Sequence, residues 1–248
     1  MSLPRKIRCA VESVVDHGGR VYSVELKPDR PIPVFQPGQF LHLTVDEFDP
    51  AGFWPESRVF SIASSPTERN RLRICYSVKG RYTQKMERAI AVGREVWIKL
   101  PYGDFVIEPD QEVVLVAGGT GISAFAAFLA MLTSQRTLPV TLVYGARSPD
   151  LLLFDEMILG QHRRIPALQV VFFAENGAPA LAARLERQSR APQCFPGRIS
   201  LPEIWPLLSD PANRLFYLAG PPAMVETLCS SLRARGATPD RIRVDAWE

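Results

Sequence analysis

Cysteine and histidine are scarce in this chain of 248 residues, and neither is grouped in a metal-binding pattern. The cysteines stand far apart and form no CxxC pair: Cys9, Cys75, Cys194 and Cys229. The histidines are equally dispersed: His17, His42 and His162. Structural zinc sites and iron–sulfur clusters are built from closely spaced thiolates and imidazoles. We therefore expect no metal site in this chain.

Long apolar runs and a strong net charge are also missing. No apolar segment approaches the roughly 20 residues of a membrane-spanning helix, and the opening MSLPRK lacks the apolar core of a signal peptide. Lys and Arg number 29 against 26 Asp and Glu, so the net charge is +3. We expect a cytoplasmic protein with neither membrane insertion nor a nucleic-acid partner.

Basic residues nevertheless cluster locally. They form three groups along the sequence: Arg69, Arg71 and Arg73; Lys79, Arg81, Lys85 and Arg88; Arg163 and Arg164. Such groups are usually solvated surface. The alternative is a docking face for an acidic protein, because complementary charge accelerates encounter.

Apolar residues alternate with polar ones over residues 1–108. Four segments show this period of two, around 22–26, 41–45, 72–78 and 96–100. Alternation is typical of strands with one buried and one wet face. Turn-forming segments rich in Gly and Pro separate them. This half therefore reads as a small antiparallel barrel.

From residue 113 onward the pattern changes to short, unbroken apolar runs. They lie at 113–116, 140–144, 168–173, 215–218 and 242–244, with helical stretches expected at 121–134, 151–160, 200–208 and 221–235. Runs without alternation fit strands that are covered on both faces. Residues 109–248 are therefore predicted to be a doubly wound α/β domain with a parallel sheet, in which 175–197 is a variable excursion with one short helix.

Three of the predicted parallel strands end in glycine. The first ends in Gly118, Gly119, Thr120 and Gly121, the second in Gly145 before Arg147, and the fourth in Gly220, Pro221 and Met224. Glycine lets the backbone approach a pyrophosphate, and the amides at a helix start attract anions. The alternative for each is a tight turn without a ligand. Because ligands bind at the carboxyl ends of such strands, the three together indicate a dinucleotide site.

Five stretches occur in a fixed order along nearly the whole chain: RVFS (58–61), VKGRYT (78–83), PYGDF (101–105), GGTGIS (118–123) and AGPPAM (219–224). Together they resemble the RxYS, GxxS/T, GPxGxF and dinucleotide motifs of the ferredoxin–NADP(+) reductase superfamily. The resemblance implies a six-stranded antiparallel flavin-binding β-barrel, followed by an NAD(P)-binding domain. The chain departs from the motifs at Phe60, Leu100 and Ala219, where Tyr, Gly and Cys are common in the family.

The resemblance also assigns roles to single residues. Arg58 would grip the flavin phosphates, Phe60 would lie against the isoalloxazine ring, and Ser61 would hydrogen-bond to flavin N5. The second motif would hold the pyrophosphate through Val78, Gly80, Tyr82 and Thr83. In relatives a C-terminal aromatic residue covers the flavin. Trp247 would do so here, together with Phe60 and Ser61 at the site of the reaction, unless it packs on the sheet edge.

The choice of dinucleotide is predicted from the end of the third parallel strand. NADPH-selective relatives carry Ser-Arg there, whereas this chain has Glu175, which would repel a 2′-phosphate and accept a ribose hydroxyl. We expect NADH to be favoured over NADPH, although Arg147 could compensate. FAD is favoured over FMN because the GxxT element would serve a pyrophosphate.

The expected function is a flavin-dependent NAD(P)H oxidoreductase that passes electrons through bound FAD to a separate, small acidic acceptor: a ferredoxin, a flavodoxin or an oxygenase component. Three alternatives remain open at this point. They are a reductase of free flavin or ferric chelates, a non-catalytic electron-transfer subunit of a larger complex, and a nucleotide-binding module without redox activity.

Overall fold

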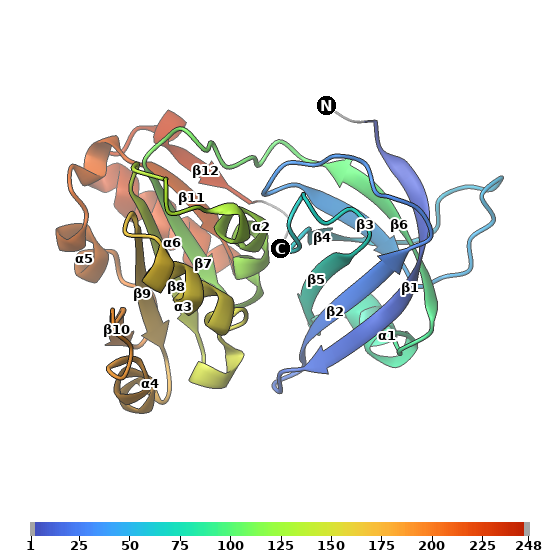
Figure 1. Cartoon of the computed structure of the whole chain (residues 1–248), viewed down its shortest axis with the longest axis horizontal. Coiled ribbons are helices and arrows are strands. Elements are labelled where there is room, and N and C mark those ends of the chain that lie inside the picture. Colours follow the sequence, from blue (N-terminus) through green and yellow to red (C-terminus); the bar gives the residue numbers. More distant parts are fainter. Residues whose placement is uncertain (1–2, 246–248) are drawn as a thin grey trace. The chain divides into compact units, whose positions relative to one another are not determined.

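The computed structural model of the chain describes residues 3–245 (Figure 1). The chain forms two compact units that meet in the sequence between Ile107 and Glu108, and each is described by itself. Within the described range, no helix is long and apolar enough to cross a bilayer.

The first unit is a six-stranded antiparallel barrel, as predicted. Its strands are β1 (Arg5–Asp16), β2 (Val21–Pro28), β3 (Phe40–Thr44), β4 (Arg58–Ser61), β5 (Leu72–Ser77) and β6 (Glu95–Tyr102). They pair in the order β4-β3-β6-β1-β2-β5. Just after β4, the amide of Ala63 donates to the carbonyl oxygen of Arg73 in β5 (2.9 Å), so the two outer strands meet and nearly close the barrel.

One helix of this unit, α1 (Arg81–Ala89), was not predicted, because residues 78–83 were interpreted only as a motif. Tyr82 and Met86 lie four residues apart and so share one face of the helix. Both are buried in the same apolar cluster as the inward-facing residues of the barrel strands. The opposite face carries the charged residues, so the helix covers the barrel with one face and meets solvent with the other.

The second unit contains a six-stranded parallel sheet, as predicted. Its strands are β7 (Val113–Gly118), β8 (Val140–Ala146), β9 (Leu168–Ala174), β10 (Gln193–Pro196), β11 (Leu215–Ala219) and β12 (Ile242–Val244). The order is β10-β9-β8-β7-β11-β12. The chain thus starts at the centre, runs outward to β10 and returns to the other side of β7. This topology places a switch point between β7 and β11, where ligands of doubly wound sheets bind.

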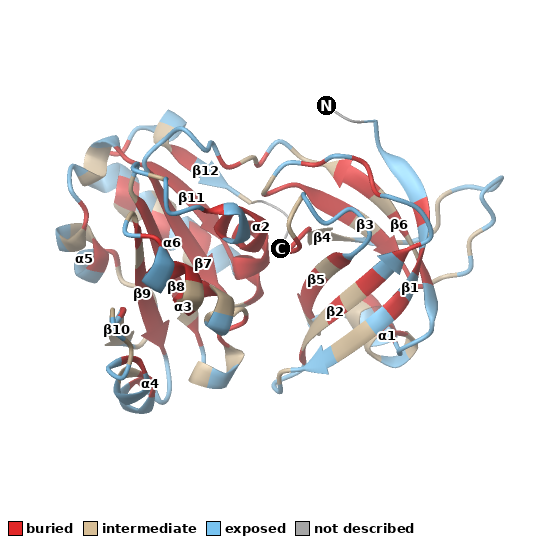
Figure 2. Cartoon of the chain, in the orientation of Figure 1, coloured by how far each residue is buried: buried red, intermediate tan, exposed pale blue. Residues whose placement is uncertain are grey.

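Helices cover both faces of this sheet (Figure 1). They are α2 (Ser123–Met131), α3 (Asp155–Arg164), α4 (Ala178–Leu185), α5 (Leu201–Ile204) and α6 (Pro222–Ala234). Apolar residues of α5 and α6 pack on one face together with Val143 and Val171. Figure 2 shows the central strands buried along their length, which accounts for their unbroken apolar runs.

Two helices differ from the sequence-based expectation. The segment expected as one helix at 200–208 is α5 followed by a separate turn, Trp205–Leu207, because Pro206 lacks the amide that would continue the helix. The helix expected from residue 151 starts at Asp155, since Pro149–Leu151 forms its own turn.

Candidate functional site

Arg58 begins β4 and points its guanidinium at the ring of Tyr82, the second residue of α1. The guanidinium carbon lies 4.6 Å from the ring centroid. Arg58 also donates to the carbonyl oxygen of Ser57 (2.8 Å) and pairs with Glu56 (2.9 Å). The side chains of that ion pair are 46% and 45% exposed, so the pair contributes about 0–1 kcal/mol. Another anion can therefore replace Glu56 at little cost.

The N-terminus of α1 has the features of an anion-binding helix end. Gly80 is its N-cap residue, and the hydroxyl oxygen of Thr83 accepts hydrogen bonds from the amides of Gly80 (3.1 Å) and Lys79 (2.9 Å). No acidic side chain lies in the first turn. A Cβ atom placed on Gly80 would meet nothing within 4 Å, so the positive end of the helix borders open space.

The contact between Arg58 and Tyr82 brings the two predicted flavin motifs together. Tyr82 itself is buried, and its hydroxyl donates to the carbonyl oxygen of Glu56 (2.9 Å), so its ring forms a floor beneath Arg58. The result combines a guanidinium, a helix N-terminus and a glycine that borders open space. These residues fit a pyrophosphate group.

Phe60 is held in place by a series of aromatic contacts. Its ring lies edge-to-face on Tyr76 in β5, with 6.2 Å between centroids, and Tyr76 stacks on Tyr22 in β2 at 5.3 Å. The hydroxyl of Tyr22 donates to Glu87 of α1 (3.1 Å), a bond that raises the pKa of Tyr22. Because Tyr76 is 3% exposed, this series fixes the half-buried ring of Phe60 and links β4 to α1.

Two other predicted residues of the barrel are placed mainly by the backbone. Ser61 ends β4, is half-buried and lies opposite Phe40 of β3 in the strand register. Val78 donates its amide to the carbonyl oxygen of Arg20 (3.0 Å) and packs against the barrel core.

Three predicted dinucleotide residues lie at the switch point, but their glycine identity is required by packing. A Cβ atom on Gly121 would lie 2.3 Å from the carbonyl oxygen of Ala219. On Gly118 it would lie 2.6 Å from the sulfur of Met224, and on Gly220 it would lie 2.8 Å from the terminal methyl of Met224. These glycines allow the ends of β7 and β11 to approach each other.

Gly119 differs from these three glycines. Its φ angle is +54°, which favours glycine, and a Cβ atom there would meet nothing within 4 Å. A short turn, Gly119–Ile122, leads into α2, where the hydroxyl of Ser123 donates to the carbonyl oxygen of Thr120 (2.8 Å). Helix α6 starts directly after Pro221. Both helices therefore follow the strand ends at the switch point, but Pro221 and Pro222 lack amides, so the start of α2 is the one suited to phosphate.

The ends of β8 and β9 bring Arg147 and Glu175 together through the backbone. The amide of Glu175 donates to the carbonyl oxygen of Ala146 (3.1 Å), and the amide of Asn176 donates to that of Arg147 (2.9 Å). Within residues 3–245 the guanidinium of Arg147 has no hydrogen-bond or ion-pair partner. The carboxylate of Glu175, by contrast, pairs with Arg198 (3.3 Å).

Arg198, Tyr76, Tyr22 and Glu87 were missed by the sequence analysis. A signal for Arg198 was present, since it follows Gly197, a fourth glycine at the end of a parallel strand, in a segment that was interpreted as a variable excursion. Nothing in the sequence indicated that Tyr22 and Tyr76 stack. Trp247 lies outside the described residues, so its predicted role stays a prediction.

Comparison with known proteins agrees with this geometry. Residues 115–230 match the oxidoreductase NAD-binding domain family. The chain is 30% identical over 183 residues to an NAD(P)H-flavin reductase of Aliivibrio fischeri, covering 68% of this chain and 74% of the relative. It is 25% identical to the reductase component of propane 2-monooxygenase of Mycolicibacterium smegmatis, covering 97% of this chain and 67% of that protein.

A solved structure shares the fold at low sequence identity. A cytochrome P450 reductase of Amycolatopsis superposes with a TM-score of 0.79 at 22% identity, covering 98% of this chain and 70% of that protein. The matched region spans only part of several curated relatives. It covers 61% of the phenol 2-monooxygenase reductase component of a Pseudomonas species, and 60% of an NAD(P)H-flavin reductase of Vibrio harveyi, a match that includes 57% of this chain.

Proposed function

We propose a function that starts from one finding, namely that this chain belongs to the ferredoxin–NADP(+) reductase superfamily of FAD-binding oxidoreductases. The proposed activity is transfer of electrons from NADH or NADPH, through bound FAD, to a separate one-electron acceptor. Relatives named as reductase components of oxygenases support this activity. FAD, when bound, supplies the conversion of a two-electron donor into one-electron steps.

The observation that carries the proposal is the position of Arg58 over Tyr82. In this arrangement Arg58 and the amides at the start of α1 would hold the pyrophosphate of FAD, and Gly80 would leave room for it. Phe60, braced by Tyr76, would present an apolar face to the flavin ring. The task of these side chains is binding and orientation, so that the redox group sits in one fixed place.

The second unit would bind the dinucleotide at its switch point. The N-terminus of α2 would face its phosphates, Gly119 would let the backbone approach them, and the start of α6 would lie beside them. Arg147 and Glu175 lie at the next strand ends, where the ribose of a dinucleotide is expected. Thr120, Gly118, Gly121, Gly220, Pro221 and Met224 shape this site.

The electron acceptor is proposed to be a small acidic protein. Arg81, Lys85 and Arg88 are spaced four and three residues apart on α1, so they share one exposed face of that helix. They line a shallow hollow together with Gln84 and Ala89, and Lys85 pairs with Asp46, so Arg81 and Arg88 supply the net positive charge. A cationic face on the helix that would also bind FAD supports docking of a ferredoxin, a flavodoxin or an oxygenase component.

The test is FAD affinity, measured by quenching of FAD fluorescence in Arg58→Gln and in a matched control, Arg71→Gln. Arg71 is a barrel arginine that is 51% exposed and pairs with Glu12. Loss of a charge-assisted contact is worth roughly 1.5–3 kcal/mol, so Arg58→Gln should weaken binding about 10- to 100-fold. The control should bind as the parent does. Equal FAD affinity of the two variants would contradict the proposed pyrophosphate site at Arg58 and the start of α1.

A second candidate function is reduction of free flavin, favoured by the names of relatives that are 30–32% identical. The two functions differ in how firmly flavin is retained. Purified chain that keeps one yellow FAD through gel filtration and reduces ferricyanide with NADH supports the electron-transfer function. Protein that loses its flavin during gel filtration, and then reduces added FMN or riboflavin with saturation kinetics, supports reduction of free flavin.

A further inference from the structure

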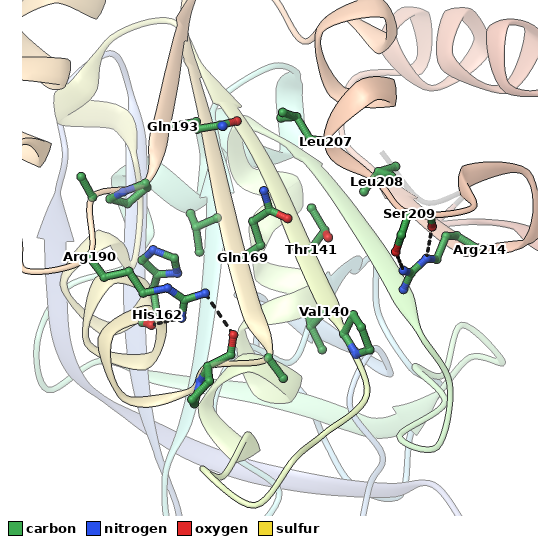
Figure 3. Close-up of a pocket in the computed structure, with 16 residues that line it drawn as sticks. Val140, Thr141, His162, Gln169, Arg190, Gln193, Leu207, Leu208, Ser209 and Arg214 are labelled. Carbon is green, nitrogen blue, oxygen red and sulfur yellow. Dashed lines mark hydrogen bonds between the residues drawn. The ribbon is translucent and has the colours of Figure 1, made fainter.

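The second unit carries a groove at the edge of the sheet opposite to the switch point. It lies where β8, β9 and β10 begin, and it has a volume of about 460 Å³ (Figure 3). The carboxyl ends of β8 and β9 lead to Arg147 and Glu175, so the groove is separated from the proposed dinucleotide site by the length of these strands. Its volume is in the range that holds small ligands.

The floor of the groove is polar, although the same face of the sheet is apolar farther along. Thr141 and Gln169 are direct neighbours in the register of β8 and β9. Gln193 of β10 is paired with Val171, two residues beyond Gln169 and therefore on the same face. Val171 belongs to the apolar cluster under α5 and α6, which do not extend over the polar row.

The three polar side chains of the floor are not used by the fold. Within residues 3–245, none of Thr141, Gln169 and Gln193 has a hydrogen-bond partner. Thr141 is nevertheless 6% exposed. The Thr141 hydroxyl, the half-buried amide of Gln169 and the exposed amide of Gln193, aligned in this way, can donate and accept several hydrogen bonds at once. Figure 3 shows these side chains on adjacent strands.

The walls of the groove are cationic. Arg190 and Arg214 are among the lining residues, and no lining residue is acidic. Arg214 is neutralised by Glu112 (2.5 Å), whereas Arg190 donates only to backbone carbonyl oxygens, those of His162 (2.8 Å), Ile165 (2.9 Å) and Pro166 (3.0 Å). Three of its five N–H groups are thereby used, and two remain for a ligand.

His162 lines the groove without adding a charge, and its Nε2 atom is buried. Its Nδ1–H donates to the carbonyl oxygen of Leu168 (2.9 Å), which leaves Nε2 unprotonated. The ring is 3% exposed, and Nε2 has no hydrogen-bond partner within residues 3–245. Burial lowers the pKa of His162, and the nearby arginines, Arg190 and Arg163, lower it further. Arg190 is therefore the cation of the lining that no carboxylate offsets.

We propose that this groove binds a small polyhydroxylated anion, such as a sugar phosphate, as a ligand separate from the dinucleotide and from FAD. The anionic group would lie on Arg190, and the hydroxyl groups would lie across Thr141, Gln169 and Gln193. Arg190, which no carboxylate neutralises, would favour a ligand with a negatively charged group. The side-chain amides of Gln169 and Gln193 would favour hydroxyl groups next to that charge, because they can form hydrogen bonds with them. The proposal does not depend on the function proposed above, since none of these residues belongs to either cofactor site.

The test is a calorimetric titration of the full chain with glucose 6-phosphate, compared with glucose, inorganic phosphate and citrate. The proposal expects saturable binding of glucose 6-phosphate, and weaker binding by about tenfold or more for glucose and for phosphate, which each keep half of the contacts. Citrate separates a general requirement for negative charge from a requirement for hydroxyl groups. Citrate or phosphate that bound as tightly as glucose 6-phosphate would reduce the groove to a nonspecific anion site and overturn the proposal.

Variants locate the binding site. Arg190→Gln should weaken glucose 6-phosphate binding about tenfold, and Arg187→Gln, an exposed arginine outside the groove, should not change it. Because Arg190 also holds three carbonyl groups, Gln169→Leu serves as a second variant that leaves those bonds intact. Absence of saturation up to about 10 mM in the parent, or unchanged affinity in Gln169→Leu together with Arg190→Gln, refutes the proposal.

Discussion

Replacement of Glu175 by glutamine is expected to shift the dinucleotide preference of this chain toward NADPH. Glu175 follows β9, at the strand end where the ribose of a dinucleotide is proposed to lie, and Arg198 neutralises part of its charge at 3.3 Å. The carboxylate is 37% exposed and Arg198 is 86% exposed, so the pair is open to solvent and easily exchanged. Glutamine removes the charge, keeps an acceptor for a ribose hydroxyl and releases Arg198 for a phosphate.

The size of the effect follows from Coulomb's law. Two unit charges about 6 Å apart, at an effective dielectric constant of about 40 for a solvent-exposed site, interact by about 1.4 kcal/mol, which is about tenfold in affinity. The KM for NADPH in Glu175→Gln should therefore fall about tenfold, while the KM for NADH changes less than about twofold. Arg198→Gln should act in the opposite direction and raise the KM for NADPH alone.

The assay is the initial rate of ferricyanide reduction with each dinucleotide, expressed as the ratio of the two kcat/KM values. Glu186→Gln provides a matched control, because Glu186 is an exposed glutamate of the same unit away from the strand ends. The thermal midpoint should be the same in all variants, since exposed ion pairs add little stability. A ratio that stays constant in Glu175→Gln would show that neither Glu175 nor Arg198 reads the ribose.

Two further predictions concern stability. Gly121→Ala should lower the free energy of unfolding by roughly 2–3 kcal/mol, because the added Cβ would press on the carbonyl of Ala219. Gly119→Ala has open space around its Cβ and should lower it by only about 1–2 kcal/mol, because alanine is strained in the left-handed backbone conformation. Urea unfolding that gave the reverse order of stability would contradict this prediction. The hydrogen bond from Arg73 lowers the pKa of Glu25 below its ordinary value of 4.5, so the stability that this carboxylate adds is fully present above that value and is lost as the pH falls through the lowered pKa. Glu25→Gln should therefore be less stable than the parent at neutral pH and equal to it in acid, and a stability gap that persisted in acid would show that Glu25 acts through packing.

The sequence predicted both sheets because each has a distinct hydrophobic period. Alternation in the first half and unbroken runs in the second correspond to strands with one and with two covered faces. The helix α1 was missed because residues 78–83 were interpreted only as a motif, although Tyr82 and Met86, four residues apart among charged residues, carry a helical signal. The break of the 200–208 helix follows from Pro206, because proline lacks the amide that would continue the helix, and this signal is visible in the sequence.

The candidate site could be predicted only where it is local in sequence. The RVFS and VKGRYT stretches were found, but the contact of Arg58 with Tyr82 joins residues of different elements and required the structure. The same holds for the pairing of Glu175 with Arg198, which modifies the predicted preference for NADH. The sequence pattern also treated all the glycines alike, whereas the structure divides them into those needed for packing and Gly119.

The difference between Gly119 and the glycines needed for packing has a consequence for how homologous sequences evolve. A lineage that stopped using dinucleotides would still be obliged to keep Gly118, Gly121 and Gly220, since their loss would push two strand ends apart. Gly119 would be released to drift toward asparagine or aspartate, which tolerate its backbone angle. Within a set of homologous sequences, the residue at this single position, more than the glycine-rich stretch around it, should therefore mark which members have abandoned the nucleotide.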